Sequence, residues 1–274
     1  MPELPEVETI ARGLNRRVRG DVIQSVWLGK YREPLKAPPQ EIARALSGTR
    51  ISQVRRVGKH IVLDLEPRSS RNGKGRRQWI VHLGMTGRML VCSPQEPALK
   101  HTHAVAFLAS GRELRFVDPR RFGRLSVTTE QTFTGPGTEP LTVRSEEFAN
   151  LFRGRRTPIK AALLNQKLLH GVGNIYADES LFRAGIRPRR RAGRLTRADL
   201  IRLHVAVKEV LTEAIKLGGS SVSDYVDAEG REGFFQLQHR VYLRTGKPCL
   251  ICGTPIKRFV LGGRGTHYCP TCQR

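Results

Sequence analysis

An apolar stripe begins within the first ten residues of the chain. It recurs every three or four residues and comprises Val7, Ile10, Leu14 and Val18. This spacing places the side chains on one face of a helix, so the segment is predicted to be a helix packed against a core. Pro5 suits the first position of that helix, because the N–H that proline lacks would have no helical partner there.

Short apolar runs typical of strands follow, separated by Gly, Ser, Asn and Pro clusters. They are Val22 to Leu28, Ile51 to Val57, Ile61 to Leu65, Trp79 to Leu83, Arg88 to Val91, Ala104 to Leu108, Glu113 to Val117 and Arg124 to Val127. A helical pattern from Pro39 to Leu46 interrupts them. Many short strands between turn signals favour an all-β sandwich or barrel. We predict a β-sandwich with a leading helix over residues 1–131.

Helical patterns replace the strands after residues 132–144, a stretch rich in Gly, Pro and Thr that we interpret as a linker. Ser145 and Thr157 are suitable helix N-caps. Thr196 and Asp199 have the spacing of a capping box, and the helix that they begin is predicted to reach Lys216. The chain is therefore predicted to be an α+β protein of two domains.

Two loops stand out by composition. Gly218 and Gly219 should end the last long helix, and the segment from Gly218 to Phe235 is rich in glycine and serine without a clear period. We predict that this segment is a mobile loop. An enlarged basic loop, Arg68 to Arg77, has no role that the sequence assigns.

The charge of the chain indicates its partner. The 274 residues include 48 Lys and Arg against 24 Asp and Glu, a net charge of +24. The segment from Leu151 to Lys216 contains fifteen basic and five acidic residues, so the excess of positive charge is concentrated there. This balance predicts a polyanionic partner such as nucleic acid.

No apolar run approaches the roughly 20 residues of a membrane span, and the acidic N-terminus does not resemble a signal peptide. We therefore expect a cytoplasmic protein with no membrane partner. Nothing in the sequence indicates an oligomeric interface, so we expect a monomer.

Four of the five cysteines form a paired motif. Cys249, Cys252, Cys269 and Cys272 have the spacing C-x2-C-x16-C-x2-C. Two such pairs can bring four thiolates to the corners of a tetrahedron, and a site with four cysteine ligands leaves no position for substrate. The motif predicts one structural Zn²⁺ ion. The hairpin between the pairs carries basic residues that suit phosphate, although a purely structural staple is the alternative.

The first residues carry candidate chemistry. Removal of Met1 would give Pro2 a free amine, and an α-amino group titrates near pKa ~8 against ~10.4 for lysine. Such an amine attacks a sugar C1′ or a carbonyl carbon to form a Schiff base. Glu3 follows directly and could transfer protons at the same carbon. The alternative is an ordinary helix start.

Three further motifs suit DNA but are weak singly. The turn HLGMTG carries Met85, and the loop DPRRFG carries Arg120 and Phe122. Together these side chains could fill the gap left when a nucleotide is flipped out of a duplex. The glycine turn before Asn174 could offer backbone N–H groups to a phosphate, although a plain helix–helix turn is the simpler interpretation. Lys59 lies between two predicted strands, where a lone lysine is normally exposed to solvent.

Motifs along the whole chain resemble the bacterial formamidopyrimidine-DNA glycosylase family, which removes 8-oxoguanine and ring-opened purines. They are PELPEVET, GKH, HLGMTG, KHTH, DPRRFG, IKAALLNQ, GVGNIYADESLF, GGSS and GRGTHYCPTCQ. The resemblance implies a catalytic β-sandwich domain at 1–131 and a helix-two-turn-helix domain at 145–235. It also implies a lid over the lesion at 218–235 and a zinc hairpin at 236–274. One departure from the family pattern is Thr138 in the linker, where the family has LGPEPL.

The resemblance implies roles for matching residues. Pro2 would attack C1′, and Glu3 would act as acid and base during ring opening and β,δ-elimination. The implied catalytic residues are Pro2, Glu3, Lys59 and Arg264. The implied DNA-binding residues are Glu6, His82, Met85, His101, His103, Arg120, Phe122, Lys160 and Asn174. The implied partner is damaged double-stranded DNA of the bacterial nucleoid.

Two other functions stay open on sequence alone. A relative with the preference of endonuclease VIII would act on oxidised pyrimidines, although the PELPE opening and the GGSS loop favour purines. A non-catalytic zinc-ribbon protein would bind DNA without Pro2 and Glu3, and both residues are present.

Overall fold

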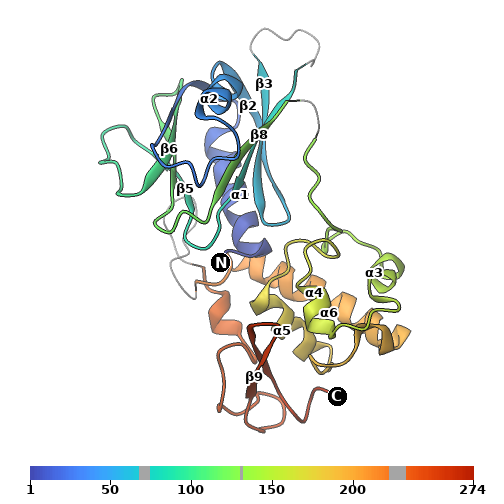
Figure 1. Cartoon of the computed structure of the whole chain (residues 1–274). Helices are drawn as coiled ribbons and strands as arrows, with labels where there is room; N and C mark the ends of the chain where they lie inside the picture. Colours follow the sequence, from blue (N-terminus) through green and yellow to red (C-terminus); the bar gives the residue numbers. More distant parts are fainter. Residues whose placement is uncertain (68–74, 130–131, 222–232) are drawn as a thin grey trace. The chain divides into compact units, whose positions relative to one another are not determined.

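The computed structural model describes residues 1–67, 75–129, 132–221 and 233–274. The chain forms two compact units (Figure 1). The first comprises Met1–Thr134 and Gly218–Gly233, and the second comprises Gly135–Leu217 and Phe234–Arg274. Most of the predicted mobile loop (222–232) and most of the basic loop (68–74) lie outside the described residues.

The first unit is built on one antiparallel β-sheet. Its strands are β1 (Val22–Leu28), β2 (Thr49–Val57), β3 (His60–Pro67), β4 (Arg77–His82), β5 (Arg88–Cys92), β6 (Thr102–Leu108), β7 (Glu113–Val117) and β8 (Arg124–Thr128). Hydrogen-bonded neighbours follow the order β5-β7-β6-β1-β2-β3-β4-β8. Helices α1 (Leu4–Val18) and α2 (Pro39–Leu46) belong to the same unit.

The sheet divides into two layers where β1 meets β2. These strands share a short ladder, at Val22–Arg50 and Ile23–Thr49, whereas β1 pairs with β6 through Leu28. Side chains from both halves nevertheless lie in one core; examples are Leu63, Trp79, Ala106 and Phe116. Both halves can face one core only if the sheet folds over on itself. The predicted β-sandwich with a leading helix is confirmed.

Helix α1 carries the apolar stripe into this core. Figure 1 shows the helix between β5 and β6 on one side and β2 and β3 on the other. All four stripe residues are at most 2% exposed. Because burial of each such side chain stabilises the fold by about 1.5–3 kcal/mol, the helix is firmly held and so are the residues before it. The predicted start is wrong by one residue, because Leu4 is the first helical residue and Pro5 the second. The missing N–H of proline costs no helical hydrogen bond at either position.

The second unit consists of helices followed by a β-hairpin. Its elements are α3 (Ser145–Phe152), α4 (Ile159–Leu163), α5 (Asn174–Arg183), α6 (Arg197–Lys216) and the hairpin of β9 (Lys257–Leu261) and β10 (Arg264–Tyr268), with 3-10 turns at Ala192–Arg194 and Phe235–Gln238. A small apolar cluster joins α5 to the hairpin segment: Phe182, Val241, Cys249, Ile256 and Cys269. The predicted arrangement of helices followed by a four-cysteine segment is confirmed. In the described parts of the chain, no helix has the length and apolar character needed to cross a membrane.

Two predicted N-caps are wrong by one residue. Helix α3 begins at Ser145 and has Arg144 as its N-cap, and α4 is preceded by Pro158 rather than by Thr157. The ψ angles of Arg144 (152°) and Pro158 (143°) are extended. Each residue therefore stands just outside its helix, in the conformation that an N-cap adopts.

Helix α6 has the predicted ends. The N–H of Thr196 donates to Asp199 Oδ2 at 3.1 Å, and the N–H of Asp199 donates to Thr196 Oγ1 at 3.1 Å. This reciprocal pair is a capping box. The helix ends at Lys216, and Gly218 follows with a φ of 76°. Glycine enters this left-handed region without the steric cost that a side chain adds, and so it ends the helix.

Candidate active site and nucleic-acid interface

The start of α1 is buried and fixed by one carboxylate. Pro2 is buried, Glu3 is 4% exposed and Glu6 is 2% exposed. Glu6 Oε2 accepts the backbone N–H of Glu3 at 2.8 Å, and Glu6 Oε1 accepts the N–H of Ser220 at 2.7 Å. Glu6 therefore links the predicted catalytic residues to the beginning of the loop at 218–235.

Gly219 is required at this link. Its φ is 84°, and a Cβ atom there would lie 2.8 Å from Glu6 Oε1 and 2.9 Å from Glu6 Cγ. Any side chain would displace the Glu6 carboxylate, in a backbone conformation that L residues rarely adopt. The glycine thus allows the chain to approach Glu6 closely.

Lys59 and two histidines lie near the end of β2, the start of β3 and the end of β4. Lys59 is 7% exposed in the β2–β3 turn, and the His60 and His82 rings lie 5.0 Å apart between centroids. The N–H of Gly84 donates to His82 Nδ1 at 3.1 Å. Burial, followed by the charges of His60, Lys59 and Arg124, lowers the pKa of His82 from 6.5 to about 4. The ring is therefore neutral near pH 7, and with Nδ1 accepting, its hydrogen is on Nε2.

Asp118 shapes the two exposed loops that the sequence singles out. Its carboxylate accepts the Thr86 hydroxyl at 2.6 Å, the Arg120 N–H at 3.2 Å and the Gly123 N–H at 2.7 Å. Asp118 itself is 0% exposed. One buried carboxylate thus joins the turn HLGMTG to the loop DPRRFG. The sequence analysis missed it, although it is the first residue of the second motif.

Three side chains project from these loops. Met85 is 40% exposed, Phe122 is 48% exposed, and the Arg120 guanidinium lies 4.7 Å from the centre of the Phe122 ring. The loops pack so closely that a Cβ on Gly84 would lie 2.5 Å from the Phe122 carbonyl carbon. The structure therefore brings together an apolar side chain, an aromatic ring and a cation, all facing outward.

The predicted histidines of the KHTH motif lie behind the loop. His101 is exposed, has a φ of 70° and accepts the N–H of Asp118 through its carbonyl at 3.0 Å. His103 is 2% exposed, and its Nε2 lies 2.9 Å from the Asp118 carbonyl oxygen. Because a carbonyl only accepts, His103 Nε2 carries the hydrogen. Both residues thus hold Asp118 in place.

In the second unit, Lys160, Asn174 and β10 meet. Lys160 Nζ donates to the Gly265 carbonyl and to Thr266 Oγ1, each at 2.9 Å, and forms an ion pair with Asp178 at 2.7 Å. Asn174 Nδ2 donates to the same Gly265 carbonyl at 3.0 Å. Arg264, the first residue of β10, is exposed beside this cluster.

Two adjacent carboxylates on α5 were missed by the sequence analysis. Asp178 accepts the backbone N–H of His267 at 2.9 Å. Glu179 accepts three backbone N–H groups at 2.8–3.0 Å, those of Arg240, Val241 and Tyr242. Burial raises the pKa of the Glu179 carboxyl, and these three amides oppose the shift. The available signal was a pair of acidic residues within a strongly basic segment.

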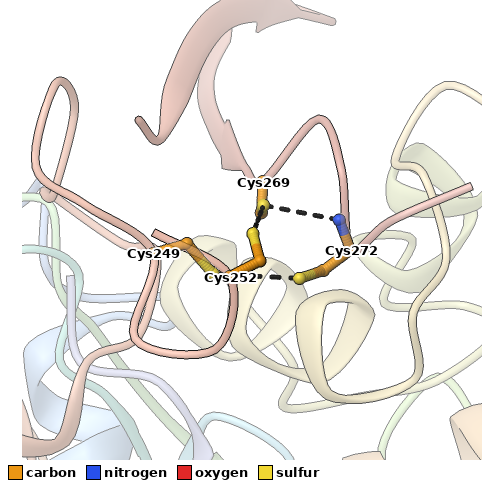
Figure 2. A group of neighbouring side chains, drawn as sticks. All are labelled: Cys249, Cys252, Cys269 and Cys272. Carbon is orange, nitrogen blue, oxygen red and sulfur yellow. Dashed lines mark hydrogen bonds between the residues drawn. The ribbon is translucent and has the colours of Figure 1, made fainter. Parts of the chain in front are cut away.

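The four cysteines of the C-terminal motif converge (Figure 2). All four sulfur atoms lie within 4.8 Å of one another, with Cys249 and Cys272 at 3.9 Å and Cys252 and Cys269 at 3.5 Å. Zinc–sulfur bonds of about 2.3 Å in a tetrahedron require sulfur separations of about 3.8 Å. The arrangement therefore fits one Zn²⁺ ion.

Three segments of the chain match known domains. Residues 1–125 match the formamidopyrimidine-DNA glycosylase N-terminal domain, residues 135–226 the formamidopyrimidine-DNA glycosylase H2TH domain, and residues 246–274 the zinc finger found in FPG and IleRS. The chain belongs to the formamidopyrimidine-DNA glycosylase family. The resemblance predicted from motifs is confirmed, and the four clustered cysteines form the structural zinc site of the family's zinc finger.

Relatives match over the full length. The formamidopyrimidine-DNA glycosylase of Solibacter usitatus is 46% identical over 276 residues and covers 100% of both chains. A Lactococcus lactis FPG mutant in complex with Fapy-dG-containing DNA is 33% identical, with a TM-score of 0.90 and 100% of both chains covered. The MutM (Fpg) protein of Thermus thermophilus is 42% identical, with a TM-score of 0.86, and the match covers 99% of this chain and 98% of that one.

Proposed function

We propose that this protein is a base-excision repair enzyme that removes oxidised purines, namely 8-oxoguanine and formamidopyrimidines, from duplex DNA. It then cleaves the strand at the abasic site that remains. Membership of the glycosylase family and the likeness to a relative bound to Fapy-dG-containing DNA support this function. The observation that carries it is the buried Pro2–Glu3 segment, fixed at the start of α1 by Glu6.

In the proposed mechanism, removal of Met1 exposes the Pro2 amine, which attacks C1′ of the damaged nucleotide. The bond from C1′ to the base breaks and the base leaves with a proton. The C1′–O4′ bond then breaks, O4′ takes a proton, and the nitrogen lone pair forms the Schiff base that joins Pro2 to the sugar. Glu3 transfers protons as the deoxyribose ring opens and during elimination. Loss of a C2′ proton expels the 3′ phosphate, and a second elimination expels the 5′ phosphate.

Neighbouring groups of the first unit hold the damaged nucleotide. Lys59 contributes a positive charge toward its phosphates and belongs to the proposed catalytic set with Pro2 and Glu3. Arg264, of the second unit, is the remaining proposed catalytic residue. His82, kept neutral by its low pKa, has an Nε2–H that can donate to a phosphate oxygen. Glu6 shapes the pocket through its bonds to Glu3 and Ser220.

Met85, Arg120 and Phe122 fill the space in the duplex that an extruded nucleotide leaves. Their exposure and their shared anchor at Asp118 support this role. Insertion of side chains stabilises the kinked duplex, because the Phe122 ring and the methionine replace lost base stacking. His101 and His103 contribute by holding the loop.

Phosphate contacts come from the second unit, where Asn174 adjoins the exposed Arg264 and Lys160 holds the strand that follows Arg264. We assign residues 1–131 to a catalytic domain, 132–144 to a linker, 145–235 to the helix-two-turn-helix domain and 236–274 to the zinc hairpin. The segment 218–235 acts as a lid over the extruded base. The protein acts as a monomer on nucleoid DNA.

Borohydride trapping tests this function, because it reduces a Schiff base to a stable bond. With an 8-oxoguanine duplex, we expect a covalent adduct on the N-terminal peptide, identified by mass spectrometry. Retention of Met1, or Pro2→Gly, should suppress it. Glu3→Gln should abolish base removal while DNA binding persists, since the amide fills the same space without proton transfer.

Each other outcome contradicts a specific part of the proposal. An adduct on Lys59 or Lys160 would exclude Pro2 as the nucleophile. Preferred excision from an oxidised-pyrimidine duplex would favour the endonuclease VIII-like function. DNA binding without any adduct or excision would favour a non-catalytic binding protein.

A further inference from the structure

The ion pair between Lys160 and Asp178 is unusual because it is completely buried. Nζ and Oδ1 lie 2.7 Å apart, and both side chains are 0% exposed. Removing two charges from water costs several kcal/mol per ion, and a buried pair often stabilises a fold no more than apolar residues of the same size. A contribution to stability therefore does not explain this ion pair. We infer that its role is to fix the positions of the groups around it.

The pair holds three consecutive residues of β10. Lys160 Nζ donates to the Gly265 carbonyl and to Thr266 Oγ1, both at 2.9 Å. Asp178 Oδ2 accepts the His267 backbone N–H at 2.9 Å and lies 3.1 Å from His267 Nδ1. Charge-assisted bonds of this kind are short and directional. The strand is thereby fixed along its length and not at one point.

The same cluster reaches Asn174. Its Nδ2 donates to the Gly265 carbonyl at 3.0 Å, so this oxygen accepts from both Asn174 and Lys160. Lys160 comes from α4, and Asn174 and Asp178 come from α5. Two helices are thus joined to β10 at the residue next to Arg264.

This geometry also decides how Lys160 acts. An ammonium group has three hydrogens to donate, and Asp178, Gly265 and Thr266 supply three acceptors within 2.9 Å. A direct contact with a DNA phosphate would require the ammonium to leave these partners. Arg264, one residue before the clamped segment, is exposed to solvent.

We propose that Lys160 and Asp178 are positioning residues: their buried ion pair clamps β10 so that Arg264 and Asn174 are presented together to the phosphates beside the damaged nucleotide. Lys160 does not itself bind phosphate. The proposal rests on the proposed excision of oxidised purines, because the phosphates that Arg264 and Asn174 would bind flank the damaged nucleotide.

A double-mutant cycle tests whether the pair acts through Arg264. The measured quantity is the single-turnover rate of 8-oxoguanine excision at saturating enzyme, for wild type, Asp178→Asn, Arg264→Gln and the double variant. Misplacement of a positioned group by about 1 Å costs about 100-fold in rate, so we expect Asp178→Asn to lose about 10- to 100-fold. If the clamp acts through Arg264, the double variant should be little slower than Arg264→Gln alone, since coupled residues are not additive.

Two further variants separate positioning from stability. Lys160→Met with Asp178→Leu replaces the pair by apolar side chains of similar size, which should keep the melting temperature and one zinc per chain. We expect the slow excision to remain in this variant. Glu213→Gln is the matched control. It removes an ion-pair partner of Arg183 that lies on the surface of α6, and it should leave the excision rate at the wild-type value.

The opposite results would overturn the proposal. Additive losses in the cycle would show that the pair acts independently of Arg264, and full activity of the apolar double variant would show a purely structural pair. A direct phosphate contact by Lys160 predicts that Lys160→Met lowers the salt dependence of binding while Asp178→Asn stays fully active. Failure of the wild-type enzyme to excise 8-oxoguanine would instead refute the proposed function, whatever the cycle gives.

Discussion

At the scale of single residues, buried carboxylates set the positions of the groups that are predicted to contact DNA. Asp118 fixes the loops that carry Met85 and Arg120, and Glu6 fixes the N–H of Glu3. A carboxylate can accept several hydrogen bonds, so one buried residue can orient two or three backbone segments. Such residues fix the positions of neighbouring groups that are proposed to act on DNA.

Arg120 is the residue predicted to recognise the base opposite the lesion. Excision should start only when 8-oxoguanine lies opposite cytosine. A guanidinium has donors and no acceptor. The unpaired edge of cytosine presents two acceptors, O2 and N3, whereas adenine places an amino donor beside N1. A good bidentate contact contributes about 1–3 kcal/mol of base discrimination, or about ten- to a hundredfold in rate when it is made in the transition state.

Arg120→Ala should therefore slow excision opposite cytosine and narrow the cytosine-over-adenine ratio, measured by single-turnover kinetics on matched duplexes. Trapping at a single-stranded abasic site should change little. The matched control is Arg121→Ala, because Arg121 pairs with Glu33 at 2.9 Å and stacks on Tyr31. An unchanged ratio in Arg120→Ala would mean that the side chain only fills space.

At the scale of elements, the zinc hairpin depends on its metal. Its apolar cluster comprises Phe182, Val241, Cys249, Ile256 and Cys269, so two of the five members are themselves zinc ligands. A cluster this small cannot order the segment by apolar burial. Zinc binding, with apparent free energies of about 10–16 kcal/mol in zinc-finger peptides, supplies the missing stabilisation.

Chelation or Cys249→Ser should release the metal, unfold the hairpin and displace Arg264. We expect weaker DNA binding by fluorescence anisotropy, together with loss of zinc measured by a colorimetric dye. Cys92→Ser is the matched control, because Cys92 lies in β5, and should retain one zinc per chain. Full affinity in a verified metal-free protein would contradict this prediction.

At the scale of the whole molecule, the net charge of +24 governs association with DNA. Each phosphate that the protein neutralises adds about −0.9 to the slope of log K against log salt concentration. Contact with about six phosphates would lower the affinity roughly a thousandfold between about 50 and 200 mM salt. A titration of duplex binding against salt measures this slope, and a flat response would refute the basic surface as the binding face.

The two units are predicted to contribute differently to DNA binding and to catalysis. The first holds the predicted nucleophile and the side chains proposed to enter the duplex, and the second contains the basic segment between Leu151 and Lys216. Non-specific attraction and lesion chemistry are therefore predicted to respond separately to mutation. Salt should affect binding more than the single-turnover rate at saturating enzyme.

The sequence by itself determined the features that depend on local spacing. The stripe of α1, the capping box at Thr196 and the cysteine pairs each involve a few neighbouring residues, and all three are found in the structure. Periodicity and metal-ligand spacing are properties of short segments, so no knowledge of the fold was needed. The motifs of the glycosylase family were recognised for the same reason.

Only the tertiary structure decided which of these motifs act together. Lys160 and Gly265 are 105 residues apart in sequence, and Thr86 and Asp118 are 32 apart, yet each pair is hydrogen-bonded. Local rules also placed the N-cap of α3 one residue late and that of α4 one residue early, because the actual caps depend on the backbone angles at Arg144 and Pro158. Asp118 and Asp178 each bond to segments that are distant in the sequence. The packing of whole elements brings those segments together.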